Sequence, residues 1–218
     1  MRCSRTRCAP RTARSSAWRS PRDHGCRQRR RPCARRAGRV RIVGGRLGGR
    51  RIAAPKGAGT RPSGDRVREA LFAMLGPLDG ERVLDLFAGS GALAFEALSR
   101  GARSAVLVEQ DRAAAEVARA NAAALGLGSD AVRVRRMPAA AALRTARARG
   151  EAYDLVFLDP PYRQAPELGD ELAAALAPLL APGARVVSES DRRHPLELPL
   201  PLGRERRYGD TLIRIHTA

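Results

Sequence analysis

The sequence predicts an α/β protein built on a mostly parallel sheet with helices on both faces. Between residues 82 and 189, short and almost entirely apolar runs alternate with Ala-rich stretches of helical length. Strands that are buried on both faces have this composition. Glycines or acidic residues follow several of these runs, at the strand ends where such sheets bind ligands. The 218 residues are enough for one domain of this kind.

Much of the net charge is concentrated before this domain. The sequence has 41 Lys and Arg against 22 Asp and Glu, a net charge of +19. Residues 1–39 hold 14 Arg and one acid without helical or strand periodicity, which predicts a disordered leader. Three interpretations stay open: an RNA-binding arm, an Arg-rich transit peptide, or translation from an upstream start codon, with Val40 as a GTG start. We favour the last of these, or a dispensable tail.

Cysteine usage and hydropathy argue against several classes of protein. Cysteines occur only in the leader, at positions 3, 8, 26 and 33, and this spacing does not indicate two matched zinc-binding pairs. We therefore expect no bound metal and a reducing, cytoplasmic environment. No apolar run approaches 18 residues and none follows the N-terminus, so we expect neither a membrane span nor a secretory signal. We expect a monomer.

The region 40–63 is predicted to form a basic hairpin, and a helix follows it. Short β-type runs at 40–43 and 51–52 are separated by glycine pairs. A helix is predicted over 66–75, capped by Ser63 or Asp65. Its predicted apolar face consists of Val67, Ala70, Leu71 and Met74.

The remainder of the domain 64–218 is an alternation of strands and helices. Strands are predicted at 82–87, 104–109, 131–135, 153–158 and 184–189. Helices are predicted near 91–100, 112–125, 138–149 and 167–180. A closing hairpin over 206–217 turns at Gly209-Asp210.

The first of these strands leads into a glycine turn, Asp85-Leu86-Phe87-Ala88-Gly89-Ser90-Gly91. Glycines let a backbone approach a ligand closely, and the following helix start offers unpaired N–H groups. Gly89, Gly91 and Ala94 also satisfy the loose dinucleotide pattern. Glu109, which ends the next strand, can accept from ribose hydroxyls of NAD or of S-adenosylmethionine. Asp85 favours the second ligand, because a buried carboxylate suits a ligand that carries an ammonium and a sulfonium.

The fourth strand ends in Asp159-Pro160-Pro161-Tyr162. Two prolines fix the backbone and leave outward-facing carbonyls. Asp159 adds a carboxylate acceptor, and Tyr162 a flat face on which a base can stack. This combination of acceptors and an aromatic ring fits a planar ring with an exocyclic –NH2. We expect Asp159 and the Pro160 carbonyl to accept the hydrogens of this amine.

With these motifs, the sequence resembles the RsmD family of bacterial 16S ribosomal RNA guanine-N2 methyltransferases. The resemblance covers about residues 41–216 and includes the segments 41–45, 49–52, 61–72 and 208–211. It implies a Rossmann-like class I methyltransferase fold with a seven-stranded sheet and a small N-terminal extension. It also implies S-adenosylmethionine as cofactor and a guanine of 16S rRNA as substrate, presented on the 30S subunit or a late assembly intermediate.

The resemblance assigns the cofactor site to the loop and to the ends of the next two strands. The residues assigned to it are Asp85, Phe87, Ala88, Gly89, Ser90, Gly91, Glu109, Gln110 and Met137. The family places an Asp or Asn after the third strand to bind adenine, but this sequence has Pro138 there. We therefore expect backbone groups or packing near Met137 to hold the adenine.

Basic residues in and after the predicted hairpin form a candidate RNA surface. They are Arg41, Arg46, Arg50, Arg51, Lys56, Arg61, Arg66 and Arg68. Phosphate contacts by such residues make binding strongly salt-dependent. A solvated charged face is the alternative for the set as a whole, and Arg66 and Arg68 can equally make ion pairs within their helix. A DNA adenine or cytosine amino-methyltransferase would share the two motifs, but 24 residues upstream leave little room for its recognition domain.

Overall fold

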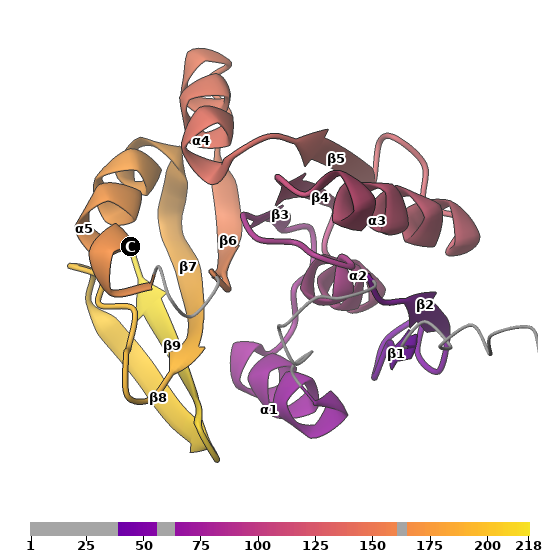
Figure 1. The fold of residues 1–218 in the computed structure, drawn as a ribbon, viewed down its shortest axis with the longest axis horizontal. Coiled ribbons are helices and arrows are strands. Elements are labelled where there is room, and N and C mark those ends of the chain that lie inside the picture. The colour runs from indigo at the N-terminus through magenta and orange to yellow at the C-terminus, as the bar shows by residue number, and fades with distance from the viewer. Residues whose placement is uncertain (1–38, 56–63, 161–164) are drawn as a thin grey trace, which may run out of the picture. The chain divides into compact units, whose positions relative to one another are not determined.

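The computed structural model describes residues 39–55, 64–160 and 165–218, without the side chains of 165–168. Residues 36–218 form one compact unit. Their described part holds a sheet of seven strands in the order β5-β4-β3-β6-β7-β9-β8 (Figure 1). These strands are β3 (Arg82–Asp85), β4 (Ser104–Glu109), β5 (Val132–Arg136), β6 (Tyr153–Leu158), β7 (Leu180–Asp191), β8 (Leu202–Tyr208) and β9 (Thr211–Thr217).

The sheet is parallel from β5 to β7 and antiparallel at its other edge. β3 pairs with both β4 and β6, so the strand order reverses direction at β3. The closing hairpin β8–β9 pairs with β7 through β9. The predicted mostly parallel sheet is thereby confirmed. The point at which the order reverses is where open α/β sheets bind ligands, outside the carboxyl ends of the strands.

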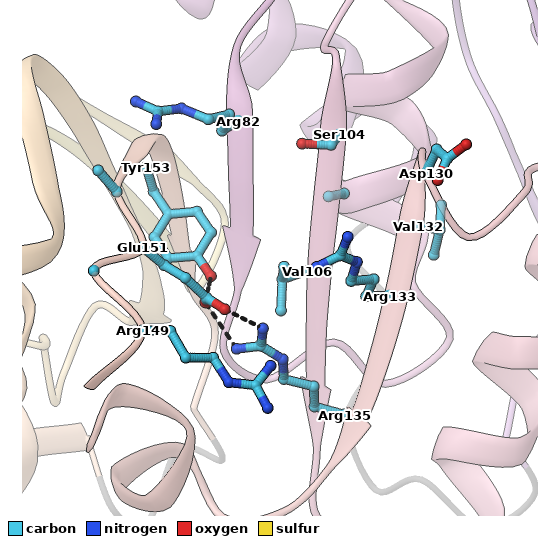
Figure 2. Close-up of a pocket in the computed structure, with 13 residues that line it drawn as sticks. Arg82, Ser104, Val106, Asp130, Val132, Arg133, Arg135, Arg149, Glu151 and Tyr153 are labelled. Carbon is cyan, nitrogen blue, oxygen red and sulfur yellow. Dashed lines mark hydrogen bonds and ion pairs between the residues drawn. The ribbon is translucent and has the colours of Figure 1, made fainter. Parts of the chain in front are cut away.

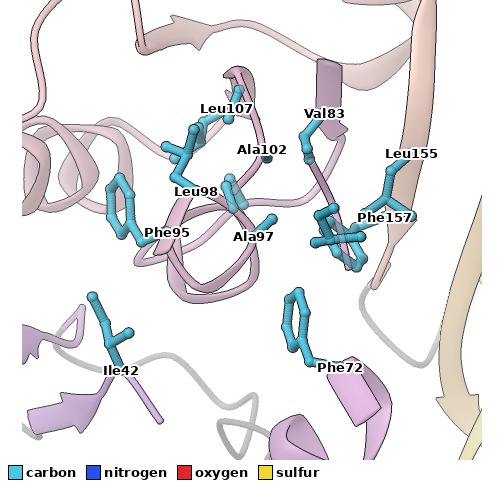
Figure 3. Close-up of a cluster of buried hydrophobic side chains, with 14 of the residues drawn as sticks. Ile42, Phe72, Val83, Phe95, Ala97, Leu98, Ala102, Leu107, Leu155 and Phe157 are labelled. Atoms are coloured by element: carbon cyan, nitrogen blue, oxygen red, sulfur yellow. The ribbon is translucent and has the colours of Figure 1, made fainter. Parts of the chain in front are cut away.

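Helices cover both faces of the sheet. They are α1 (Asp65–Leu75), α2 (Ala92–Ser99), α3 (Arg112–Ala124), α4 (Ala139–Ala148) and α5 (Ala165–Leu176), which the 3-10 turn η1 (Ala177–Leu179) follows. On one face, Phe72 of α1 and Phe95 of α2 join Leu107 and Phe157 of the sheet in a buried cluster (Figure 3). On the other face, Leu143 of α4 and residues of α5 pack against the sheet in a second cluster.

The predicted cap of α1 and the predicted end of the helix over 167–180 are wrong, and the predicted apolar face of α1 is confirmed in part. Asp65 is the first residue of α1 rather than its cap, since Gly64 occupies the N-cap position without a side-chain bond. The buried face of α1 is Arg68, Leu71, Phe72 and Leu75, whereas Val67 and Met74 are half-buried. The predicted helix over 167–180 ends at Leu176, because Pro178 lies in η1 and β7 begins at Leu180.

The predicted N-terminal hairpin is present and is anchored to α2. β1 (Arg39–Arg41) pairs antiparallel with β2 (Arg51–Ala53). Glu96 of α2, fully buried, accepts hydrogen bonds from the amides of Val43 at 2.7 Å and Gly44 at 2.8 Å. Buried polar contacts of this kind fix the hairpin in one position, because an unpaired group there would be costly.

Candidate active site

The glycine loop lies at the carboxyl ends of β3 and β4. The Ala88 amide donates to the Val108 carbonyl at 3.0 Å, and the Gly89 amide donates to Glu109 Oε2 at 2.9 Å. Gly91 has φ +84°, and a Cβ there would lie 2.4 Å from the Phe95 ring. A Cβ on Gly89 would meet no atom within 4 Å. Gly91 is thus required by the packing of α2, while Gly89 faces open space.

Asp85 is a buried carboxylate at the end of β3. Its side chain is 1% exposed, and its Oδ1 has no hydrogen-bond partner. The pKa of Asp85 is raised to about 7. Burial is the largest cause, the backbone amide of Phe87 acts in the opposite direction, and the charge of Glu109 adds to the increase. Among the described residues, no cation forms a salt bridge with Asp85. A buried acid in this state favours a cationic ligand, which would compensate its charge.

Asp159 directly follows β6, beside Asp85. Asp85 pairs in register with Phe157, and Leu158 pairs with Ser188 of β7. Burial raises the pKa of Asp159 well above its ordinary value, and the charges of Glu189 and Asp85 raise it further. Three neighbouring strands therefore contribute carboxyl groups to this edge of the sheet. Pro160 is buried, while Pro161 and Tyr162 lie outside the described residues.

The ends of β4 and β5 supply the other predicted cofactor residues. Glu109 Oε1 accepts from the Asp111 amide at 2.8 Å, which leaves a free lone pair on each carboxylate oxygen. The Met137 amide donates to the Glu109 carbonyl at 3.2 Å, which ties the end of β5 to the end of β4. Gln110 and Pro138 are exposed, and Pro138 is the N-cap of α4.

The predicted basic surface divides into two groups of residues. Arg68 is 2% exposed and donates to the Arg41 carbonyl and to Asp65, so the structure gives it a structural role and not an exposed one. Arg50 donates to the carbonyls of Ala124 and Leu125 at the end of α3. Arg41, Arg46, Arg51 and Arg66 are exposed. Lys56 and Arg61 lie outside the described residues.

Sequence reasoning missed residues that the fold brings to the site. Asn121 of α3 donates to the Ser90 carbonyl in the glycine loop at 3.0 Å. Glu189 of β7 lies beside Asp159, and Arg192 and Arg193 follow the end of β7. No local sequence pattern marks Asn121 or Glu189 as part of the site, because their contacts join segments that are distant in the sequence.

A separate pocket of about 290 Å³ lies at the opposite, amino edge of the sheet. It is lined by the first residues of several strands, and Figure 2 shows Arg135 and Tyr153 both directed at Glu151. Arg135 Nη1 donates to Glu151 at 2.9 Å and the Tyr153 hydroxyl donates at 2.6 Å. Arg82 is paired with Asp154 at 3.0 Å. None of the predicted cofactor or catalytic residues lines this pocket.

The described ranges contain neither a cluster of metal ligands nor a membrane-spanning helix. Within 39–55, 64–160 and 165–218, no group of three or more His, Cys, Asp or Glu could hold a metal ion. In the same ranges, no helix is long and apolar enough to cross a membrane.

The strand order, with the glycine loop at its point of reversal, defines a class I methyltransferase fold. The chain belongs to the family described as conserved hypothetical protein 95, whose model matches residues 40–217. The predicted resemblance is thereby confirmed at the level of the family.

Similar proteins carry methyltransferase names. The Bacillus subtilis (strain 168) protein "Putative rRNA methyltransferase YlbH" is 38% identical over 81% of this chain and 98% of its own. The ribosomal RNA small subunit methyltransferase D of Escherichia coli (strain K12) is 42% identical over 59% of this chain and 63% of its own. The solved structure of yhhF from Escherichia coli, described as a methyltransferase, has 37% identity and a TM-score of 0.70, covering 83% of this chain and 98% of that one.

Proposed function

We propose that this chain transfers a methyl group from S-adenosylmethionine to the exocyclic N2 of a guanine in 16S rRNA of the small ribosomal subunit. The observation that carries the proposal is the pair of neighbouring acids, the buried Asp85 and the half-buried Asp159, at the point where the strand order reverses. The names of the relatives support the same reaction class and an rRNA substrate.

The residues around the glycine loop fit S-adenosylmethionine better than a dinucleotide. The Oδ1 of Asp85 is buried and has no hydrogen-bond partner. An ammonium group of the ligand would offset the free-energy cost of this buried carboxylate, whereas an uncharged ligand would not. Glu109 keeps lone pairs for ribose hydroxyls. Backbone groups or packing near Met137 and Pro138, at the end of β5 and the start of α4, would hold the adenine. When bound, S-adenosylmethionine supplies an electrophilic methyl group next to the loop.

In this proposal, Asp159 acts on the amine of the base. The lone pair of guanine N2 is delocalised into the ring, which makes N2 a weak nucleophile. Asp159 and the Pro160 carbonyl accept the two N2 hydrogens, which localises the lone pair and directs it at the methyl group. The bond from N2 to the methyl carbon would replace the bond from that carbon to sulfur, and Asp159 would accept the proton that N2 releases. The raised pKa of Asp159 suits it to this proton.

Exposed cations next to the site are proposed to bind the RNA backbone. Arg46, Arg51 and Arg66 are exposed in and after the N-terminal hairpin. Arg192 and Arg193 follow the carboxyl end of β7, the same edge of the sheet as Asp159. These residues supply phosphate contacts, which position RNA without reading its sequence.

The test substitutes Asp159 and measures binding and turnover separately. Asp159→Asn removes the proton acceptor, so we expect turnover to fall by about 100-fold or more. Cofactor affinity, measured by calorimetry, should change less than about threefold, because the proposal assigns the ammonium group to Asp85. Asp154→Asn is the matched control, since Asp154 lies at the other end of β6 and is paired with Arg82.

The substrate is identified in the same experiment. Labelled methyl donor is supplied with 30S subunits, naked 16S rRNA or duplex DNA, followed by nucleoside analysis. N2-methylguanosine from the ribosomal substrates supports the proposal. Methylated adenine or cytosine in DNA, or full turnover by Asp159→Asn, would contradict it.

A further inference from the structure

Asn121 of α3 makes hydrogen bonds to two segments that are distant in sequence. Its side chain is 4% exposed. Oδ1 accepts from the Ala53 amide at 2.9 Å, and Nδ2 donates to the Ala53 carbonyl at 2.9 Å. Nδ2 also donates to the Ser90 carbonyl at 3.0 Å. Both amide hydrogens are thus used, one on β2 of the hairpin and one on the glycine loop.

The hairpin is held on its other side by α2. Ser99 Oγ accepts from the Leu47 amide at 2.8 Å and donates to the Gly44 carbonyl. Glu96 binds the amides of Val43 and Gly44. Among the described residues, Asn121 is therefore the hydrogen-bonded link between this anchored hairpin and the loop that contains Ser90.

We propose that Asn121 is a positioning residue that couples the docking of the N-terminal hairpin to the conformation of the cofactor loop. S-adenosylmethionine then binds more tightly when the hairpin is docked, although the hairpin does not form the cofactor site. A hydrogen bond between the hairpin and the loop stabilises the state in which both segments are in place. The coupling is reciprocal, so a docked hairpin favours cofactor binding and bound cofactor favours the docked hairpin. The inference rests on the proposed cofactor.

The first test measures cofactor affinity in variants of the full chain. Asn121→Asp keeps the shape and the acceptor for Ala53 but loses the donors to the two carbonyls. We expect its dissociation constant for S-adenosylmethionine to rise about three- to tenfold, the effect of one lost hydrogen bond. Thr145→Ala is the control, since Thr145 bonds only within α4 at Ala141 and should leave the constant unchanged.

The second test separates coupling from a simple loss of stability. Ser99→Ala loosens the hairpin from the far side without contact to Ser90. We expect it to raise the dissociation constant about two- to fivefold in the wild-type background and to have no effect in the Asn121→Asp background. An unchanged constant in Asn121→Asp, or effects of the two substitutions that multiply, would overturn the proposal.

If Asn121→Asp does not fold, hydrogen exchange on Ser99→Ala decides the question. Coupling predicts faster exchange of the Gly89 and Gly91 amides than in wild type, and unchanged exchange overturns it. Failure of the proposed function looks different: wild-type protein would then bind no S-adenosylmethionine. Binding of 30S subunits adds a further comparison, because bound cofactor should tighten it in wild type and not in Asn121→Asp.

Discussion

Single residues determine the electrostatics of the candidate site. Asp85 ends β3 and Asp159 follows the neighbouring strand β6, and the charge of Asp85 raises the pKa of Asp159. Among the described residues, neither forms a salt bridge, whereas other partly buried acids such as Glu151 have an arginine partner. Acids whose pKa is raised by burial and by like charge are typical of functional sites. A cationic group of the proposed ligand would compensate the ionised form of Asp85.

Cofactor binding should depend on pH through Asp85. The pKa of Asp85 is raised to about 7 in the folded protein. Between about pH 4 and pH 7 this carboxyl group keeps its proton in the folded state and loses it in the unfolded state, so the free energy of unfolding falls as the pH rises. A bound ammonium group favours the ionised form. We therefore expect the affinity for S-adenosylmethionine to increase between about pH 6 and pH 7.5, and calorimetry at several pH values measures it. Asp85→Asn should bind weakly with a flat profile; a pH-dependent profile in that variant would contradict the assignment.

At the scale of elements, sequence patterns predicted strands and helices better than the contacts between them. The strands 104–109 and 153–158 were predicted with the observed bounds, because their apolar runs end sharply at polar or proline residues. The predicted face of α1 is confirmed in part, since Leu71 is buried and Val67 and Met74 pack against the core. The burial of Arg68 was not predicted, because one of its partners, the Arg41 carbonyl, lies 27 residues away. The contacts of the hairpin with Glu96 span more than 50 residues, so periodicity gave no sign of them.

The two loop glycines should respond differently to substitution. A Cβ on Gly91 would lie 2.4 Å from the Phe95 ring and 2.8 Å from Leu107, at φ +84°. We expect Gly91→Ala to destabilise the fold by about 2–4 kcal/mol, through overpacking and backbone strain. Gly89→Ala meets no atom and should cost only about 1 kcal/mol, the left-handed backbone penalty. Urea denaturation compares the two; equal losses would contradict the difference in packing.

Arg50 and Arg51 should also differ, although they are adjacent. Arg50 donates to the last carbonyls of α3 at 2.6 and 3.0 Å, where a cation also favours the helix dipole. We expect Arg50→Ala to lower the free energy of unfolding by about 1 kcal/mol. Arg51→Ala removes an exposed side chain and should change it by less than about 0.5 kcal/mol. Thermal melts of both variants check this, and a larger loss in Arg51→Ala would be inconsistent with the contacts of Arg50.

At the scale of the whole molecule, the distribution of charge sets the expected mode of RNA binding. The edge of the sheet that carries Asp85 and Asp159 gathers carboxyl groups, and the two arginines that follow β7 there, Arg192 and Arg193, are paired with Asp210. The exposed arginines Arg46, Arg51 and Arg66 lie on the N-terminal hairpin and α1. Cations at the amino edge are partly neutralised, as Arg82 is by Asp154 and Arg135 by Glu151. The amino-acid sequence predicted the basic hairpin, but only the fold separates exposed arginines from structural ones. RNA phosphates should therefore contact the hairpin side.

The salt dependence of RNA binding tests this distribution. Replacing Arg46, Arg51 and Arg66 together by Gln removes three exposed charges and avoids the structural contacts of Arg50 and Arg68. We expect weaker binding to 30S subunits and a slope of log affinity against log salt that is smaller by about 2 to 3, since each phosphate contact contributes about 0.7–0.9.

The control replaces Arg133, Arg147 and Arg149, three exposed arginines of β5, α4 and its C-cap. It removes the same charge. If RNA is held on the hairpin side, the control should lose affinity through the weaker overall field but keep its slope nearly unchanged; equal slopes in both variants would show instead that net charge alone drives the association.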